Sequence, residues 1–335
     1  MTDRLRAHTP AASSHRPTGA IELAGDSAAV GRTRALLERA AVLDSGVLIV
    51  AERGIEVESV ARDLHAGRRG PAAPLIAVGC ADDAVVVDRS LFGVPAMPQP
   101  TDLVAVSPQS AVACARGGTL FLHDVTELPA PVQARLARLA RDGEMWLDGQ
   151  EVPTDCRLVA SAPPSVERDV REHRFRVDLY RRIAASRIDL PPLRDRSEDI
   201  PALVARLIEE HRNEHGGPVR RFTDAALALM SALPWAGNLA ELRSVIGRVL
   251  CQTNQAVVQI EQVLPSLRLD RSMSAFIPAG SLREARQRFE RDYIAAVLQY
   301  HGWKVAEAAQ TLGIQRPNLY RKARQLGIPV NRIDD

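Results

Sequence analysis

Residues 47–59 read VLIVAERGIEVES, and this stretch decides the fold class. The apolar run 47–50 predicts a buried strand, the glycine-containing residues after it predict a turn, and a helix is expected to follow. A buried strand that leads through such a turn into a helix is where a phosphate-binding loop would lie. The P-loop pattern G-x-x-x-x-G-K-[ST] is not met, because the second glycine and the lysine are missing. Two interpretations stay open: a nucleotide site that has lost its chemistry, or a turn that never had any.

The same alternation of buried strands and helices continues along the chain. Further strands are predicted at 74–78, 118–122 and 156–161, and helices at 28–43, 56–66 and 130–141. Strands that alternate with helices predict an α/β fold with a mostly parallel sheet covered on both faces. Residues 94–113 hold four prolines and show no clear period, which predicts an insertion loop.

From Asp199 onward the sequence shows no pattern that predicts a strand, and the rest of the chain is expected to be helical. A small all-α subdomain is predicted from helices at 199–215, 223–232 and 238–251, and a C-terminal group from helices at 281–299, 304–311 and 315–325. The expected organisation is a disordered segment 1–19, an α/β core 20–193, a helical lid 194–265, a linker 266–280 and a C-terminal domain 281–335.

Composition is that of an ordinary soluble globular protein, with 46% apolar and 25% charged residues among 335. The net charge is only +2, but residues 281–335 carry ten basic and six acidic side chains, which favours a polyanion as partner of that segment. Four scattered cysteines without metal-ligand spacing are expected to be small core residues in a reducing compartment. The sequence has no apolar run long enough for a membrane span and no signal peptide, so a cytoplasmic location is expected.

Residues 304–328, KVAEAAQTLGIQRPNLYRKARQLGI, form the most specific pattern of the chain. Gly313 permits a tight turn between two short helices, and Leu319 and Ala323 are predicted to face the core. Basic and amide side chains suited to phosphates and base edges surround the second helix: Lys304, Gln315, Arg316, Asn318, Tyr320, Arg321 and Lys322. The alternative is an ordinary helical hairpin with a solvated charged face.

This segment resembles the Fis-type helix-turn-helix that ends many bacterial enhancer-binding proteins. The resemblance implies binding to palindromic double-stranded DNA and dimerisation through the preceding helix, 281–299. One departure concerns the first short helix, where Ala306 and Glu307 replace a hydroxyl residue and an arginine that often contact phosphates.

Residues 21–265 resemble the AAA+ domain of sigma-54-dependent (NtrC-type) activators. The resemblance rests on ordered matches that include LFG at 91–93, GGTLFLHDVTELPAPVQARLARL at 117–139 and PWAGNLAELRSVI at 234–246. It implies a P-loop-type core with a helical lid, in a family that hydrolyses ATP as a ring and remodels the sigma-54 polymerase. No receiver or sensor domain is expected before Ile21.

Compared with the motifs of that family, the expected nucleotide site differs at four places. Val57 stands for the P-loop lysine and Glu56 for a glycine, and only Glu52, Gly54 and Glu58 persist in a loop that starts at Ala51. The other three losses are His123-Asp124 at the Walker B position, Ala162-Pro163 at the sensor and Ala240 at the lid arginine. Imidazole is a poor Mg²⁺ ligand, so His123 is better explained as a buried or capping residue. No catalytic residue, no metal site and no bound ATP are therefore expected. The H-x-x-E-H pattern at 211–215 has no evident third ligand, so zinc is not expected either.

The resemblance also assigns arginine fingers, which act on a neighbouring subunit, to Arg176 and Arg182. Both could instead be retained for packing, with Asp178 and the acids of RDRSED at 194–199 as partners. Residues 94–113 lack the G-A-F-T-G-A motif that touches sigma-54. The leading interpretation is an oligomeric, DNA-binding bacterial regulator on a degenerate AAA+ scaffold. The alternatives are a residual ATPase that still activates sigma-54, and a non-hydrolysing subunit that joins an active AAA+ homologue or RNA polymerase.

Overall fold

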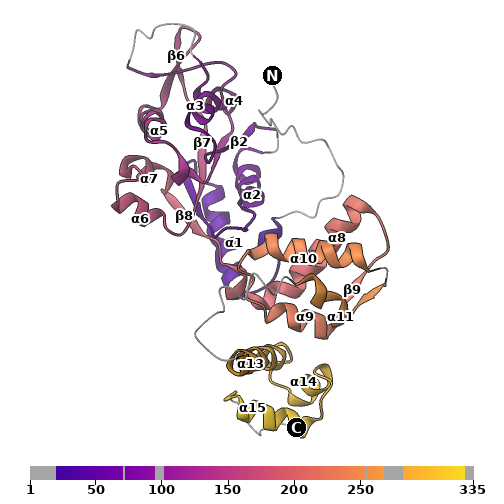
Figure 1. Cartoon of the computed structure of the whole chain (residues 1–335). Helices are drawn as coiled ribbons and strands as arrows, with labels where there is room; N and C mark the ends of the chain where they lie inside the picture. The colour runs from indigo at the N-terminus through magenta and orange to yellow at the C-terminus, as the bar shows by residue number, and fades with distance from the viewer. Residues whose placement is uncertain (1–19, 71, 95–101, 254, 268–281, 329–335) are drawn as a thin grey trace. The chain divides into compact units, whose positions relative to one another are not determined.

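The computed structural model describes residues 20–70, 72–94, 102–253, 255–267 and 282–328 (Figure 1). The chain divides into two compact units. Unit 1 contains Ala28–Pro191 with the chain up to Leu23, and unit 2 contains Ala24–Ser27 with Pro192–Asp335. The predicted disordered segment 1–19 and most of the predicted linker 266–280 lie outside the described residues.

A five-stranded parallel sheet with strand order β2-β4-β7-β1-β8 forms the centre of unit 1. Its strands are β1 (Val47–Val50), β2 (Leu75–Gly79), β4 (Thr119–His123), β7 (Arg157–Ala162) and β8 (Ser186–Asp189). The predicted strands at 47–50, 74–78, 118–122 and 156–161 therefore exist, each within one residue. The α/β core with a parallel sheet is confirmed.

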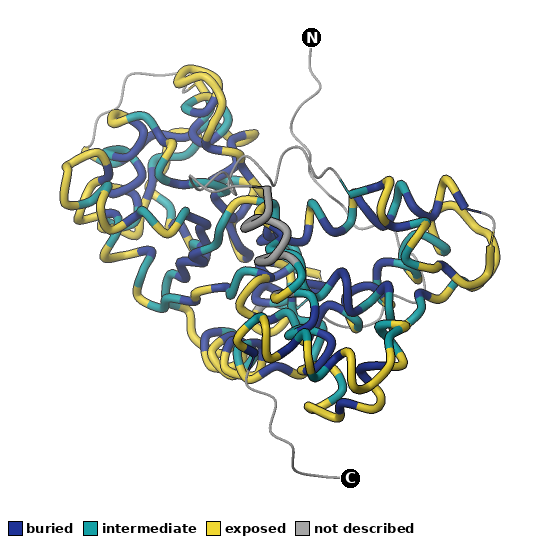
Figure 2. The backbone as a smooth tube through the Cα atoms, turned by 60° about the horizontal axis from the view of Figure 1, so that its bottom comes forward, coloured by how far each residue is buried: buried dark blue, intermediate teal, exposed yellow. Residues whose placement is uncertain are grey.

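Alternation along β1 explains why this sheet is covered on both faces. Val47 and Ile49 point into a core that also contains apolar residues of α1 (Ala28–Ala41) and α2 (Val57–Arg69). Leu48 and Val50 belong to the core on the opposite face. That second core includes residues of α3 (Ala84–Phe92), α5 (Ala130–Asp142) and α7 (Val177–Ile183). Successive side chains of a strand point to opposite faces, so one apolar run serves two cores. Figure 2 colours the buried segments of the backbone dark blue and the exposed segments yellow.

Two expectations about strands were wrong. The sequence prediction stopped at four strands, whereas β8 is a fifth and pairs in parallel with β1. The second concerns the predicted loop 94–113, of which residues 95–101 lie outside the description. It contains the short strand β3 (Val104–Val106) and the helical turn α4 (Ala111–Cys114).

Strand β3 belongs to a second, three-stranded sheet with the order β3-β5-β6. β5 (Glu144–Leu147) and β6 (Gln150–Pro153) form an antiparallel hairpin. Its two turn residues, Asp148 and Gly149, have φ angles of 50° and 83°. An Asp-Gly pair with positive φ at both positions is the preferred two-residue hairpin turn. Unit 1 is completed by η1 (Ile21–Leu23), η2 (Val125–Glu127) and α6 (Val166–Arg171).

Unit 2 begins with the lid, which is mainly but not entirely helical. Its helices are η3 (Leu193–Asp195), η4 (Ser197–Asp199), α8 (Ile200–His215), α9 (Asp224–Ser231), α10 (Asn238–Gln252), α11 (Ile260–Val263) and η5 (Leu264–Ser266). The all-α prediction missed a small parallel pairing between β9 (Arg221–Phe222) and β10 (Val257–Val258). Trp235 lies in the lid core as expected, where its indole Nε1 donates to Met230 O at 2.7 Å.

Three helices end the described chain: α13 (Leu282–Tyr300), α14 (Val305–Thr311) and α15 (Arg316–Gln325). They match the predicted helices at 281–299, 304–311 and 315–325 to within one residue at each described end. Their shared core contains Val297, Leu298, Ala308, Leu319 and Ala323, all fully buried. The two residues predicted to face inward from the last helix therefore do so.

Two further properties concern the described residues as a whole. None of the helices in the described ranges is both long and apolar enough to cross a bilayer. The cysteine expectation was only partly right, because Cys80 is buried and Cys156 half-buried, whereas Cys114 and Cys251 are exposed.

Candidate nucleic-acid interface and phosphate-loop edge

The turn between α14 and α15 is built around Gly313, whose φ is 64°. The Gly313 N–H donates to Gln310 O at 3.1 Å, and the Ile314 N–H donates to Ala309 O at 3.1 Å. This pair of bonds is a Schellman ending of α14, which needs a left-handed residue at the Gly313 position. The backbone then turns into α15 with Gln315 as the extended N-cap residue. Local chemistry therefore fixes the steep helix-turn-helix geometry.

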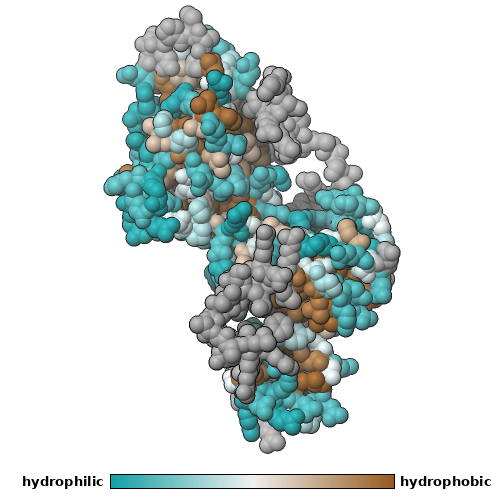
Figure 3. All heavy atoms as spheres, in the orientation of Figure 1, coloured by the Kyte–Doolittle hydropathy of each residue, from teal (hydrophilic) through white to brown (hydrophobic). Residues whose placement is uncertain are grey.

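One side of α15 faces solvent and carries polar recognition groups. Gln315, Arg316, Asn318 and Arg321 are exposed, and the Arg321 Nη2 donates to Asn318 Oδ1 at 3.2 Å. The opposite side is the buried pair Leu319 and Ala323. Figure 3 shows hydrophilic residues over the position of α15. Exposed arginine and amide side chains on one helix face can bind phosphates and base edges.

Two residues of this face were not predicted. Arg324 and Gln325 are exposed, and they follow Arg321 by three and four positions along α15. Residues three and four apart share a helix face, so this spacing was the signal that could have identified them.

The remaining predicted DNA-binding residues lie differently. Tyr320 packs against the helix-turn-helix core. The Lys322 Nζ forms an ion pair with Glu290 Oε1 of α13 at 2.9 Å, and the Lys304 Nζ pairs with Glu307 Oε1 at 3.1 Å. The Lys304 ammonium, by its hydrogen bond, lowers the pKa of the Glu307 carboxyl. Tyr320 and Lys322 thus contact other parts of the small domain, whereas the exposed Lys304 pairs with a residue three positions along the chain.

The predicted phosphate loop follows β1 directly, and we call residues 51–56 the β1–α2 loop. The Ala51 N–H donates to Ala162 O of β7 at 3.0 Å, and Gly54 adopts a φ of 86°. Val57, at the P-loop lysine position, is 5% exposed and packs in the core with Val60 and Leu64 of the same helix. The helix that opens from this loop therefore starts with a buried apolar side chain.

The backbone N–H of Glu56 is bonded to a carboxylate that lies far away in the sequence but in the same unit. It donates to Glu22 Oε1 of η1 at 2.6 Å, and Glu22 is only 2% exposed. Glu56 is half-buried, whereas Glu58 is exposed in the first turn of α2 and contacts Arg62 at 3.2 Å. Three carboxylates thus lie near the N-terminus of α2. Glu22 was missed by sequence reasoning, because it is 34 positions from Glu56 and belongs to no motif.

At the end of β4, His123 and Asp124 contact each other. The distance from His123 Nδ1 to Asp124 Oδ2 is 3.1 Å, and both residues are half-buried. Asp124 has a φ of 56°, and its N–H donates to Ser161 Oγ at 2.9 Å. His123 is therefore half-buried and not fully buried as one of the two expectations had it, and its imidazole contacts the Asp124 carboxylate.

The two other positions that were predicted to be degenerate lie at element ends. Pro163 follows β7 directly, and its carbonyl accepts the Val166 N–H at 3.0 Å. Ala240 is exposed in the first turn of α10, in unit 2.

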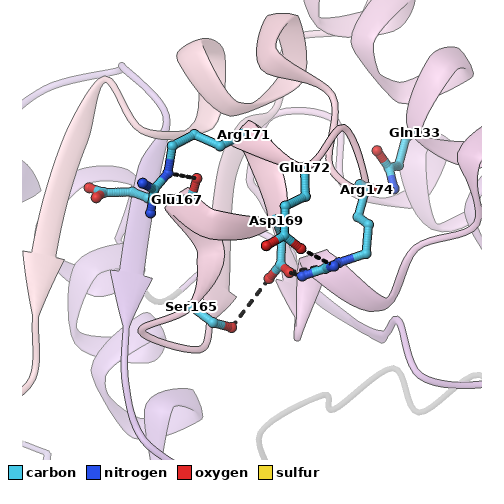
Figure 4. A network of polar contacts seen from close by, with 7 residues as sticks. All are labelled: Gln133, Ser165, Glu167, Asp169, Arg171, Glu172 and Arg174. Atoms are coloured by element: carbon cyan, nitrogen blue, oxygen red, sulfur yellow. Dashed lines mark hydrogen bonds and ion pairs between the residues drawn. The ribbon is translucent and has the colours of Figure 1, made fainter.

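The arginine-finger-like residues lie on and before α7, on a segment that Gln133 holds. The buried Gln133 donates from Nε2 to Leu128 O at 2.7 Å and to Arg174 O at 3.1 Å. Its Oε1 accepts the Arg176 N–H at 2.9 Å. Figure 4 shows the ion pair of Arg174 with Asp169 in the same network.

Both arginine side chains have partners within unit 1. The Arg176 guanidinium binds Asp178 through two hydrogen bonds at 3.0 and 2.7 Å. By these bonds it lowers the pKa of the Asp178 carboxyl. Arg182 Nη1 donates to Ala140 O near the C-terminal end of α5 at 2.8 Å. Asp178 is thus a partner of Arg176, as the packing alternative supposed.

The described ranges hold no group of three or more His, Cys, Asp or Glu side chains arranged for a metal ion. The rings of His211 and His215 stack with centroids 4.4 Å apart on α8. Burial, followed by the charges of His215 and Arg220, lowers the pKa of His211.

Comparison with known families accounts for nearly the whole described chain. Residues 23–189 match the Sigma-54 interaction domain, residues 194–275 the AAA+ ATPase lid domain, and residues 285–326 the Fis family of bacterial regulatory proteins. The order of the three matches is the order of the core, the lid and the helix-turn-helix.

Individual relatives show the same combination. The chain is 30% identical to the nitrogen assimilation regulatory protein NtrX of Azorhizobium caulinodans, covering 91% of this chain and 69% of the relative. It is 31% identical to the DNA-binding transcriptional regulator NtrC of Rhizobium meliloti, covering 93% and 71%. A crystal structure of NtrX from Brucella abortus in complex with ATP superposes with a TM-score of 0.70 at 28% identity, covering 91% and 69%.

These matches agree with the parallel-sheet core, the lid and the Schellman-ended helix-turn-helix. They cover more than two thirds of each of these regulators. The chain therefore belongs to the NtrC/NtrX-type family of sigma-54-dependent, enhancer-binding transcriptional regulators.

Proposed function

We propose that this regulator binds specific double-stranded DNA through α15 and acts without hydrolysing ATP or remodelling the sigma-54 polymerase. Cytoplasmic action on a palindromic site as a dimer or larger homo-oligomer follows from this proposal. Side chains of 282–289, in the helix that would carry the dimer contact, lie outside the description. The observation that carries the proposal is the junction of the β1–α2 loop with α2, where Val57 is buried and the Glu56 N–H is bonded to Glu22.

The loop argues against a bound triphosphate on two physical grounds. A P-loop neutralises phosphate with a lysine and cradles it with backbone N–H groups. Here the lysine position is an apolar residue of the core, and a carboxylate accepts the N–H of the residue before it. The Walker B position offers an imidazole and one carboxylate that contact each other, and Mg²⁺ prefers oxygen ligands.

The DNA-binding half of the proposal is supported by α15. Its exposed face combines Arg316 and Arg321 with the amides of Gln315 and Asn318, next to the turn at Gly313. Arginine contacts guanine or phosphate, and amides contact adenine. Each such contact contributes about 1–3 kcal/mol of binding free energy.

The double variant Arg316→Ala/Arg321→Ala tests this half directly. Genome-wide mapping of bound DNA supplies the site, and fluorescence anisotropy then measures affinity for that duplex at several salt concentrations. The double variant is expected to bind at least about 100-fold more weakly and to lower the salt slope by about 2. Lys322→Ala is the matched control, because Lys322 lies on the same helix but pairs with Glu290. Equal binding by the double variant and the wild type would sink the assignment.

A second candidate is a non-hydrolysing subunit in a ring formed by an ATP-hydrolysing relative. It is favoured by Arg176 and Arg182, which are exposed at the surface of unit 1 and held by the Gln133 contacts. Mixing the full chain with an ATPase-competent homologue tests this role. A change in hydrolysis that Arg182→Ala removes would support it, and hydrolysis unaffected by mixing would exclude it.

A further inference from the structure

The N-terminus of α2 is bonded to a buried acid of the same chain. Glu22 is 2% exposed, and its Oε1 lies 2.6 Å from the N atom of Glu56, the residue just before the helix begins at Val57. A buried carboxylate is costly unless hydrogen bonds compensate its charge. The first N–H groups of a helix and its dipole are suited to that task.

The same groups bind ligand phosphate in phosphate-binding loops. There the helix N-terminus after a buried strand offers N–H groups to an anion, and the dipole favours negative charge. In this chain the helix follows β1 in the same way. The group that meets it is the side-chain carboxyl of Glu22.

Glu22 is held in place by its neighbours as well as by its own bond. The Ala20 N–H donates to Asp63 Oδ2 of α2 at 2.7 Å, and Leu23 O accepts from Arg34 Nη2 of α1 at 2.5 Å. Ile21 is also buried, at 5% exposure. The segment 20–23 is thus tied to both helices that cover this face of the sheet.

We infer that Glu22 is the built-in anion of the β1–α2 loop and takes the hydrogen-bonding position that a ligand phosphate would need. This inference rests on the proposed function, and it names the residue that keeps the loop closed to phosphates. A phosphate would have to displace Glu22 and would also meet the carboxylates of Glu56 and Glu58. The loop keeps its conformation because the chain supplies the charge that a nucleotide supplies elsewhere.

The first test asks whether the charge of Glu22 matters at the Glu56 amide. Hydrogen exchange of the full chain is measured for Glu22→Gln, which keeps the shape and removes the charge. Exchange at the Glu56 amide is expected to become at least about tenfold faster, because the N–H then donates to a neutral amide oxygen, a weaker acceptor than a carboxylate. Glu58→Gln is the matched control, since it removes a carboxylate from the same helix end that pairs with Arg62 instead. Equal acceleration in both variants would overturn the inference.

The second test asks whether the position can then accept phosphate. Thermal unfolding is followed with inorganic phosphate and with chloride at the same ionic strength, for the wild type, Glu56→Gly and Glu22→Ala/Glu56→Gly. Only the double variant is expected to unfold at a higher temperature in phosphate than in chloride. Stabilisation of the wild type or of Glu56→Gly to the same extent would overturn the inference. No phosphate effect on a folded double variant would also count against it.

These outcomes separate the inference from the proposed function. If Glu22 is not the anion of the loop but the wild type still binds no ATP, the proposed function stands. If the wild type binds and hydrolyses ATP, the proposed function fails whatever the variants do. Should Glu22→Ala/Glu56→Gly not fold, the exchange measurement on Glu22→Gln still decides.

Discussion

At the scale of single residues, Arg157 shows how a charged side chain can serve the core. It is 1% exposed at the start of β7. Its guanidinium donates to Ala40 O at 2.6 Å, to Ser45 O at 3.3 Å and to Leu64 O at 3.4 Å. The Ala40 carbonyl belongs to the last turn of α1, where the helix dipole favours a cation. One side chain thereby connects α1, α2 and the chain that leads into β1.

Arg157→Met is expected to lower the free energy of unfolding by about 3 kcal/mol, because buried carbonyl groups lose their donor. Urea denaturation of the full chain measures the loss. Arg168→Met is the matched control on exposed α6, and its effect should stay within about 0.5 kcal/mol. Similar stabilities for the two variants would show that the Arg157 hydrogen bonds contribute little.

Cys80 illustrates a pKa set by burial. It is fully buried after β2, and burial, reinforced by the charge of Asp124, raises the pKa of its thiol to about 12. The thiol is thus protonated at pH 8, whereas exposed Cys114 and Cys251 are open to reagents. Labelling with a thiol reagent at pH 8 should modify Cys114 and Cys251 in the native chain and leave Cys80 unmodified until urea is added.

The same shift gives a direction for stability against pH. The folded pKa lies above the unfolded value of 9.0, so between about pH 9 and pH 12 the folded state binds more protons than the unfolded state. The contribution of Cys80 to stability is therefore complete below pH 9 and is lost as the pH rises toward 12. Cys80→Ala should make the stability fall less steeply over that window than in the wild type. An unchanged slope would contradict the raised pKa.

At the scale of elements, the turn between α14 and α15 depends on one glycine. Gly313 has a φ of 64°, and a Cβ added there would meet nothing within 4 Å, so only the backbone conformation disfavours a side chain. Gly313→Ala is expected to destabilise unit 2 by about 1–2 kcal/mol. Gly247→Ala should instead stabilise it by about 0.5–1 kcal/mol, because Gly247 lies within α10 with open space around its Cβ and no left-handed φ. Chemical unfolding followed by circular dichroism measures the free energy of unfolding of both variants. A change of the same sign in the two would contradict this explanation.

The elements also show what the sequence could and could not predict. β1 and β4 were predictable because apolar runs buried on both faces leave a local signal. β8 was missed because its four residues contain one fully buried side chain, Ile188, between Arg187 and Asp189, which pair with each other. β3 was missed because its strand partner β5 lies some forty residues later in the chain. The bond between Glu22 and Glu56 was out of reach for the same reason, since only the folded chain brings them together.

At the scale of the whole molecule, the family combines a core, a lid and a helix-turn-helix, and this chain retains all three. The proposed absence of nucleotide from the β1–α2 loop is compatible with this fold, because residues of the chain itself make the contacts around the start of α2. Val57 belongs to the apolar cluster on one face of the sheet, and Glu22 accepts the N–H of Glu56 just before α2. The stability of unit 1 is therefore expected to be independent of nucleotide.

Mass action makes that expectation measurable. A ligand that binds only the folded state at 100 times its dissociation constant stabilises the protein by about 2.7 kcal/mol, which shifts the unfolding midpoint by several degrees. ATP with Mg²⁺ at millimolar concentration should leave the midpoint of the full chain unchanged, and anisotropy should find the same DNA affinity with and without ATP. Because the ATP complex of Brucella abortus NtrX exists, that relative is the positive control for the titration. A midpoint that rises with ATP in both proteins would mean that the loop binds nucleotide despite Val57 and Glu22. A rise in NtrX alone would mean that regulation by this chain proceeds through DNA binding and subunit contacts, without a nucleotide cycle.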